Sequence, residues 1–465
     1  MKKRQFSRLL RISVAILLLA VLLSCICSCR VELSKEEIVD NISAAEDKSY
    51  NYVWNYLVDF GLPEFDKTKF TWAENVFQYN FNLEGGLPKT LDHARLTALT
   101  FIEKYYDTIN LEDKGDVTDA LITCYVDAIG DPYSIYRTPV EQEDYSGDMS
   151  GKFGGIGVVI EYDHEAETLM VSSVYIDSPA EKAGILVGDY IVGVEGKSIE
   201  EIGYLNVVNL VRGEIGTDVR ITLKRGESTL EVVATRAEVE EKTVSYEILE
   251  GNIGYVQLAS FKENTFKQFA DAIDSLEASG VKGYIFDLRN NLGGFVSSVR
   301  DIVSYLIPNG HPIISYQYKT GGLTVLESTD DIHPSKTDPT DSSKPLTKDN
   351  KITAPMVVLC NEYTASAGEL FTAAMRDYNE SGLIKATLVG AKTYGKGIMQ
   401  SQGAYFDGST ITLTVAYYNP PSGENYHIEG ITPDHVIENE LDGNKLIDKQ
   451  LPKAIEELNK LINAN

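Results

Sequence analysis

The sequence predicts a multidomain α/β protein, and three features of the 465-residue chain support this prediction. Strand-like and helix-like stretches alternate across residues 240–320 and 350–440, which is typical of a largely parallel sheet covered by helices. Residues 150–238 contain five or six short β-type runs separated by Gly, Asp and Pro, with room for two helices. We therefore expect a small, compact α/β module followed by a larger one.

The first thirty residues predict a targeting segment. A basic stretch precedes an uncharged run of 18 residues from Ile12 to Cys29, which is at the lower limit for a membrane span. The order of basic, apolar and small residues is typical of a secretory signal. Leu22-Leu-Ser-Cys25 resembles a bacterial lipoprotein box, with Cys29 as the alternative lipidated residue, and an uncleaved anchor helix is the other interpretation. Each interpretation predicts that residues 31–465 are extracytoplasmic and tethered to a membrane.

Charge and cysteine content limit the partners and the covalent cross-links that we expect of this protein. The formal net charge of −27 argues against a nucleic-acid partner, because phosphate binding needs basic patches. Only Cys124 and Cys360 lie outside the targeting segment, each in an apolar run, so we expect inert core residues and no disulfide framework.

The remaining helices, strands and loops are predicted from the spacing of apolar residues and from the glycines and prolines that interrupt it. Residues 31–149 predict an N-terminal helical region: a tether, helical stretches near 34–60, and two helices within 91–127 that end at Gly130-Asp-Pro. In the larger module the expected strands are 253–258, 283–288, 356–360 and 386–390, and the expected helices are 265–279, 295–306 and 365–378. Polar residues 320–350 predict a surface loop, Asp407-Gly408 predicts a hairpin, and the apolar spacing within 441–465 predicts a closing helix.

Ser366 is a candidate nucleophile. It follows a predicted strand and a short turn, and it opens a helix, so its hydroxyl would be exposed at the end of the sheet. The free N–H groups of that helix end, Ala367 among them, would lie close to a developing oxyanion. The alternative is that Ser366 or Thr364 only caps the helix.

Lys396 is a candidate general base, flanked by Gly395 and Gly397. A lysine acts as a base near neutral pH only when its pKa falls by about 3 units from ~10.4, which burial can cause. Gln400 is placed to hold the amine toward Ser366. Lys392 is a competing candidate without paired glycines, and an ordinary surface lysine is the alternative.

Gly293 and Gly294 end the stretch Asp287-Leu-Arg-Asn-Asn-Leu-Gly-Gly294, which follows a predicted strand. Either backbone N–H is a candidate second oxyanion donor, and an ordinary glycine turn is the alternative. The six histidines form no metal-binding cluster, so we expect no metal, although a Ser/His/Asp triad stays open.

The small module carries a candidate peptide site. Phe153-Gly-Gly-Ile-Gly-Val158 precedes its first strand, and successive N–H groups in such a loop can bind a carboxylate. A peptide adding beside residues 158–161 would place its last side chain in an apolar pocket. The candidate residues of this site are Gly155, Ile156, Gly157, Val158, Leu205 and Val208, although the apolar ones can equally be core alone.

Taken together, these segments resemble the C-terminal processing peptidases, or tail-specific proteases, of family S41 over about residues 92–460. The matching motifs are Gly130-Asp-Pro-Tyr-Ser134, Gly155-Ile-Gly157, Ser178-Pro-Ala180, Gly188-Asp189, Asp287-Leu-Arg289 with Gly293-Gly294, Thr364-Ala-Ser-Ala-Gly-Glu369, Thr393-Tyr-Gly-Lys-Gly-Ile-Met-Gln400 and Gly430-Ile-Thr-Pro-Asp434. Two departures are a few additional residues within 377–385, and Thr364 and Gly368 in the nucleophile segment.

The resemblance implies a crotonase- or ClpP-like peptidase core at 239–440, a PDZ domain at 150–238 and a helix at 441–465 that packs on the core. It implies that Ser366 is the nucleophile, Lys396 the general base and Gln400 its orienting residue. Protein tails would be the partners, and no cofactor would be needed. Two rival interpretations are a PDZ adaptor on a catalytically weak peptidase fold and a Ser/His hydrolase of the tricorn-core type.

Overall fold

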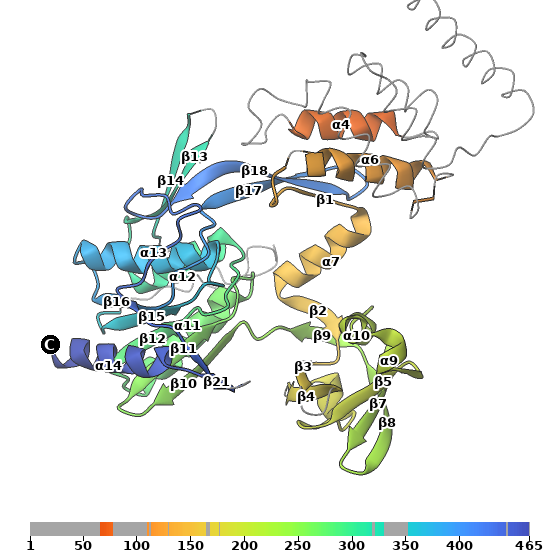
Figure 1. Cartoon of the computed structure of the whole chain (residues 1–465), viewed down its shortest axis with the longest axis horizontal. Coiled ribbons are helices and arrows are strands. Elements are labelled where there is room, and N and C mark those ends of the chain that lie inside the picture. The colour runs from red at the N-terminus through yellow and green to blue at the C-terminus, as the bar shows by residue number, and fades with distance from the viewer. Residues whose placement is uncertain are drawn as a thin grey trace, which may run out of the picture. The chain divides into compact units, whose positions relative to one another are not determined.

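The computed structural model describes residues 66–77, 109–110, 113–128, 130–163, 168–175, 177–318, 321–329, 352–442 and 445–464 (Figure 1). The predicted targeting segment with Cys25 and Cys29, the helices expected near 34–60 and most of the 320–350 loop lie outside the described residues. Contacts divide the chain into one unit of Met1–Tyr136, Gln402–Phe406 and Thr410–Leu413, and a second of Arg137–Ser401, Asp407–Ser409 and Thr414–Asn465. Across the described residues, no helix has both the length and the apolarity needed to cross a membrane.

Two helices, α4 (Lys67–Phe77) and α6 (Lys114–Ala128), pack together in the first unit, which also holds most of β1 (Ile135–Arg137). Helix α6 is the second of the two helices predicted within 91–127, and it ends just before Gly130 as expected. Tyr125 lies against rings from α4, edge-on to Phe70 and stacked on Phe77. The buried aromatic residues therefore fix how the two helices pack.

The small module, in the second unit, has the predicted mixture of short strands and helices. Its main sheet has the order β3-β4-β5-β7-β8, with β6 paired to β5. The strands are β3 (Val158–Asp163), β4 (Thr168–Val174), β5 (Tyr190–Val194), β6 (Lys197–Ser198), β7 (Asp218–Arg225) and β8 (Ser228–Thr235). Helices α8 (Pro179–Lys182), α9 (Ile199–Ile202) and α10 (Tyr204–Val211) belong to the module. It is entered through α7 (Pro139–Ser150) and closed by the pair β2 (Lys152–Gly155) and β9 (Ala237–Glu240).

The larger module is built on a six-stranded sheet with the order β10-β11-β12-β15-β16-β19. Its strands are β10 (Val244–Leu249), β11 (Ile253–Leu258), β12 (Gly283–Asp287), β15 (Met356–Cys360), β16 (Ala386–Gly390) and β19 (His435–Val436). Strand β10 is antiparallel to β11, and every later pairing is parallel. The sequence predicted this largely parallel sheet from the alternation of strands and helices.

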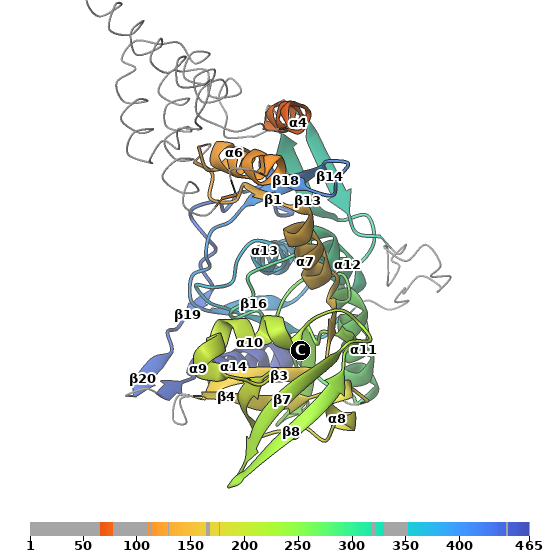
Figure 2. The ribbon, with the colours of Figure 1, turned by 90° about the vertical axis from the view of Figure 1, so that its right-hand side faces the viewer.

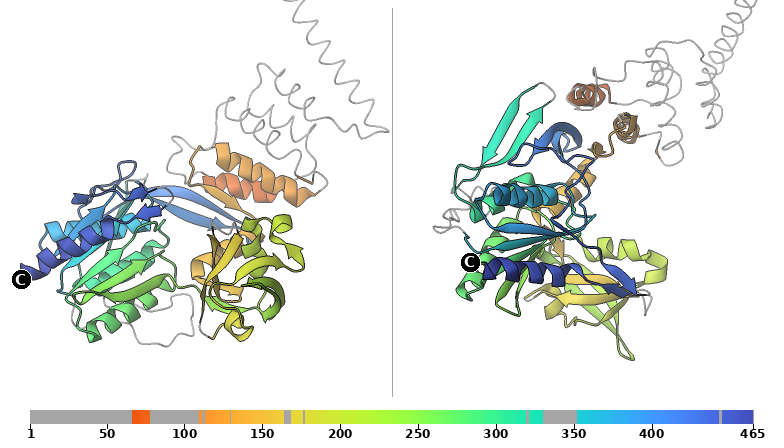
Figure 3. Two further views of the ribbon diagram at one scale, coloured as in Figure 1. Left: turned by 60° about the horizontal axis from the view of Figure 1, so that its bottom comes forward. Right: turned by 60° about the vertical axis from the view of Figure 1, so that its left-hand side comes forward.

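Helices cover both faces of this sheet (Figures 2 and 3). Helices α11 (Thr265–Ala278), α12 (Val296–Leu306) and α13 (Ala367–Glu380) share a core with Tyr284 and Phe286 of β12. Ile285, between them, points to the other face, where α14 (Gln450–Asn463) covers it with Leu458. The alternation follows from the two-residue period of a strand, and it explains why a strand buried on both faces reads as a continuous apolar run.

A second sheet contains β13 (Pro312–Tyr318), β14 (Leu323–Glu327), β17 (Ile398–Ala404) and β18 (Thr410–Asn419). The predicted Asp407-Gly408 turn joins β17 to β18, with Gly408 at φ 97°. The loop predicted for 320–350 is wrong at 323–327, because Leu323-Thr-Val-Leu-Glu327 forms β14 and pairs with β13. A pairing partner outweighed the polar flanking sequence. Strands β20 (Glu440–Asp442) and β21 (Lys445–Ile447) form a small hairpin before α14.

Candidate active site

Three loops meet at one edge of the large sheet because they follow parallel neighbouring strands. The turn 288–294 follows β12, the nucleophile segment 361–366 follows β15, and the base segment 391–397 follows β16. The carboxyl ends of parallel strands lie at the same edge of a sheet, which is where open α/β folds bind ligands. The edge therefore gathers segments that are far apart in the sequence.

Ser366 stands at the N-cap position of α13 in an unusual backbone conformation. Its φ and ψ are 53° and −118°, whereas the Ser and Thr caps of three other helices (Thr138, Ser178 and Ser198) have φ between −63° and −71°. Capping alone needs only the extended conformation. A non-glycine residue at positive φ carries a strain that surrounding contacts must maintain, and such strain concentrates at functional sites. The cap interpretation is therefore incomplete.

The glycine turn packs directly on the nucleophile. A Cβ added to Gly293 would lie 2.8 Å from Ser366 Cβ and 2.9 Å from the backbone nitrogen of Ala367. The Ala365 N–H donates to the Asn291 carbonyl at 2.9 Å, which fixes the two segments side by side. Gly293 has φ 105°, so glycine is required there both for space and for conformation.

The two predicted oxyanion donors of this turn differ. The N–H of Gly293, next to Ser366, donates to Asn291 Oδ1 at 2.8 Å. Among the described residues, no hydrogen bond involves the N–H of Gly294 or that of Ala367. Both glycines therefore stay candidates for the second oxyanion donor. Gly293 lies next to Ser366, whereas the N–H of Gly294 is not already used in a hydrogen bond within the described part of the chain.

Glu369 joins the nucleophile to the base segment, and it is not among the site residues predicted from the sequence. Its fully buried carboxylate accepts hydrogen bonds from the N–H of Ser366 at 2.9 Å and the N–H of Lys396 at 2.7 Å. The N–H of Gly395 and the hydroxyl of Thr393 also donate to it, each at 2.6 Å. The signal that could have revealed Glu369 is its place three residues after Ser366, the spacing of a capping box.

Opposing effects act on the Glu369 carboxyl. Burial raises its pKa, and the hydrogen bonds from Thr393, Lys396, Gly395 and Ser366 lower it. Burial is the larger effect, so the pKa is raised overall. A buried carboxylate with four donors is satisfied, and three of these donors belong to the base segment while the fourth is the Ser366 N–H. Glu369 therefore joins the two catalytic segments, and the Tyr394 N–H, which donates to the Thr364 carbonyl at 3.0 Å, is a second link between them.

Tyr418 of β18 is a second residue that sequence reasoning missed. Its hydroxyl donates to the Lys396 carbonyl at 2.7 Å and lies 3.4 Å from Ser366 Oγ. The side chain is almost fully buried, and burial raises its pKa, so the phenol stays a protonated donor. No motif indicated it, because Tyr418 falls within an ordinary strand pattern.

Lys396 and Gln400 lie on the base segment and on β17, and the described contacts do not test the roles predicted for their side chains. Lys396 is half-buried, and its backbone is fixed by Glu369 and Tyr418. Among the described hydrogen bonds, none joins its amine to Ser366 or to Gln400. The side-chain amide of Gln400, on β17, lies 3.3 Å from Thr414 Oγ1 instead. The roles of both side chains stay predictions.

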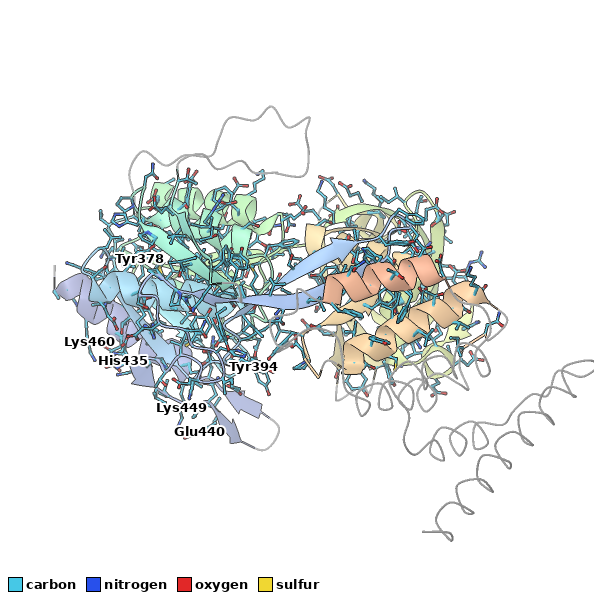
Figure 4. All side chains as sticks on the ribbon, turned by 90° about the horizontal axis from the view of Figure 1, so that it is seen from above. Tyr378, Tyr394, His435, Glu440, Lys449 and Lys460 are labelled. Atoms are coloured by element: carbon cyan, nitrogen blue, oxygen red, sulfur yellow. The ribbon has the colours of Figure 1, made fainter. Side chains whose placement is uncertain are left out.

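The competing bases are less well placed. Lys392 is exposed. The described histidines, His311, His427 and His435, make no hydrogen bond to Ser366; His435 instead lies 3.5 Å from Glu457 on the α14 face (Figure 4). His93, His164 and His333 lie outside the described residues.

The long spacing between Ser366 and Lys396 does not separate their loops. The additional residues of 377–385 form the C-terminal end of α13 and the turn into β16, at the opposite end of the helix from Ser366. Tyr378, in that region, and Tyr394, in the base segment, are labelled in Figure 4. Strand β16 then runs back parallel to β15, with Gly390 beside Cys360.

The peptide site predicted in the small module corresponds to a pocket of about 370 Å³. The predicted residues that line it are Gly155, Ile156, Gly157, Val158 and Val208. Leu205 lies on α10, and its side chain is outside the described part of the structure. Strand β3 is at the edge of its sheet, so a peptide strand has a place to pair.

Comparison with known proteins follows the same division of the chain. Residues 252–437 match the model of peptidase family S41, and residues 170–225 match a PDZ domain. The carboxy-terminal processing protease CtpA of Bacillus subtilis is 36% identical over 338 residues, covering 71% of this chain and 67% of that protein. A probable CtpA-like serine protease of Staphylococcus haemolyticus is 36% identical over 341 residues, covering 72% and 64%.

Among solved structures, the photosystem II D1 C-terminal processing protease aligns with a TM-score of 0.43 and 24% identity, covering 79% of this chain and 92% of that one. The chain spans about two thirds of the length of the curated relatives described above. The family match, the identity to these relatives and the arrangement of the two modules agree. The chain belongs to peptidase family S41, contains a PDZ domain, and is related to serine proteases that process carboxyl termini.

Proposed function

We propose that this protein is a serine endopeptidase that cleaves protein substrates near their C-termini by a Ser/Lys mechanism. The observation that carries the proposal is the shared Glu369 carboxylate, which accepts from the backbones of both Ser366 and Lys396. A serine in a strained conformation that shares one buried carboxylate with a glycine-framed lysine fits a nucleophile and its base better than a helix cap.

The chemistry follows from these groups. Ser366 Oγ attacks the scissile carbonyl while the neutral amine of Lys396 takes its proton. The N–H of Ala367 and that of Gly293 or Gly294 stabilise the oxyanion. Lys396 then gives the proton to the leaving amine, and water hydrolyses the acyl-enzyme by the reverse sequence. In this scheme Tyr418, which donates to the Lys396 carbonyl, keeps the base segment beside Ser366.

The substrate class rests on the PDZ domain. A pocket beside an edge strand suits an extended peptide that ends in an apolar residue. We expect cells with the active protein to contain proteins with shortened C-termini that are intact when Ser366→Ala replaces it. Mass spectrometry of protein C-termini from the two strains measures this. Identical sets of C-termini, with both proteins equally abundant, would refute the proposed function.

We also propose that the protein is tethered outside the cytoplasm through its N-terminal segment. The support is the sequence alone: a basic stretch, an apolar run and a lipobox-like Cys25. Cys25→Ser is expected to abolish incorporation of a labelled fatty acid, whereas Cys29→Ser retains it. If labelling is lost only in Cys29→Ser, then Cys29 is the lipidated residue. Absence of labelling in the unaltered protein would contradict lipidation and would favour the interpretation of an uncleaved anchor helix.

A further inference from the structure

One pocket of the PDZ domain is lined in part by residues from outside that domain. Its apolar part includes Ile156, Val158, Val208 and Val211. Lys262, which also lines it, belongs to the peptidase core, between β11 and α11. The pocket is therefore shared between the two modules of the second unit.

The charged residues of this pocket leave an excess of positive charge. Arg212, Lys242 and Lys262 line it together with only two acidic residues, Asp148 and Glu241. The chain as a whole carries a formal charge of −27. A locally positive pocket in a strongly acidic protein attracts an anion that the rest of the surface repels. The anion that accompanies a peptide strand with an apolar last residue is its terminal carboxylate.

Lys262 is the buried member of this group. Its side chain is 10% exposed, and its amine donates to Asp148 at 2.9 Å and to Glu241 at 2.8 Å. An ammonium group has three donors, and these two carboxylates use two of them. Both acids are partly exposed, at 46% and 28% of their side chains, so water can solvate them when the amine turns to a ligand.

We propose that Lys262 binds the terminal carboxylate of the substrate tail and is a specificity-determining residue of the peptidase. This proposal rests on the proposed function, because it concerns how the same enzyme selects tails. Lys242, which is exposed at the same pocket, adds positive charge, but among the described ion pairs its amine is not held in place by acidic partners as that of Lys262 is. The PDZ domain would bind the peptide strand, the apolar side chain and, through the N–H groups of its 155–157 loop, the carboxylate oxygens. Lys262 of the core would add the positive charge that distinguishes a true C-terminus from an internal segment.

The position of Lys262 links the tail pocket to the catalytic edge. Its neighbour Phe261 donates its N–H to the Gly293 carbonyl at 2.9 Å and accepts from the Phe295 N–H at 2.7 Å. A Cβ added to Gly294 would lie 2.2 Å from the Phe261 carbonyl oxygen, so the contact is close. The lysine that binds the tail thus follows directly after the residue that packs on the oxyanion turn.

The test compares two forms of one ligand on the full-length Ser366→Ala protein. A short fluorescent peptide ending in valine is titrated with a free carboxylate and with a terminal amide, and binding is followed by anisotropy. We expect the acid to bind about tenfold more tightly than the amide, the size of one charge-assisted hydrogen bond. Adding Lys262→Met should reduce this ratio to near one, and Lys262→Arg should largely retain it.

Lys69→Met is the matched control, because Lys69 is equally buried, at 8% of its side chain, and pairs with Asp119 in the first unit. It should leave the ratio unchanged. Since the ratio is measured within one protein, a partial loss of folding cancels. A ratio in Lys262→Met equal to that of the parent, or equal weakening of both peptides, would overturn the proposal. Acid selectivity that depends on Lys262, together with no peptide cleavage by the protein that retains Ser366, would instead refute the proposed function alone.

Discussion

Lys396→Ala should abolish peptide cleavage, with kcat falling by about 10⁴-fold or more, because Ser366 then has no base to accept its proton. Lys396→Arg should be equally inactive, since a guanidinium stays protonated and cannot act as a base. The measurement is the rate of cleavage of a short peptide at saturating concentration. Both variants should fold, because the segment is held by backbone hydrogen bonds to Glu369 and Tyr418.

Lys392→Ala is the control for this experiment, since Lys392 is an exposed lysine in the same loop and should be dispensable. Full activity in Lys396→Ala would contradict the Ser/Lys mechanism. If that activity were lost on removal of one histidine, the Ser/His interpretation would replace it. Loss of activity in Lys392→Ala but not in Lys396→Ala would exchange the roles of the two lysines.

Glu369→Ala should cost both stability and activity. It leaves the donors of Ser366, Lys396 and Gly395 without their acceptor in a buried site, which is expected to lower the free energy of unfolding by about 3 kcal/mol. Without the shared carboxylate between Ser366 and Lys396, kcat should fall by more than about 100-fold, since small displacements of reacting groups are costly. Denaturant unfolding and peptide cleavage at a temperature where the variant is folded measure the two effects.

Glu457→Gln is the matched control, because Glu457 is another buried glutamate but lies on α14. Its partners His435 and Lys460 are visible on that face in Figure 4. The control should lose some stability and keep kcat once folded. A folded Glu369→Ala protein with unchanged kcat would show that Glu369 is structural only and does not position the catalytic segments.

Much of this architecture could be predicted from local patterns. The strand runs at 284–286 and 356–360 are apolar because residues such as Ile285 and Phe286 are buried on opposite faces of one sheet. Helix-capping and turn residues in the sequence then predicted that Ser366 begins a helix and that the paired glycines 293–294 follow a strand. The order of these segments along parallel strands predicted that they share an edge.

The sequence could not predict the contacts between loops. Glu369 contacts Lys396 across 27 positions of the sequence, and Tyr418 contacts it across 22, and no periodicity predicts such a pairing. The strand β14 was missed for the same reason, since its pairing with β13 decides its structure. Gln400 was placed in the right region, but its side chain lies on Thr414, a partner that only the β17–β18 pairing brings close.

Cleavage by purified Ser366→Ala protein tests the central claim most directly. The wild-type and variant proteins are incubated with one unstructured protein substrate that ends in an apolar residue, and the fragments are identified by mass spectrometry. The account predicts C-terminal fragments with the wild type and none with the variant, at equal folding by circular dichroism. The same fragments appearing at the same rate with Ser366→Ala would contradict it.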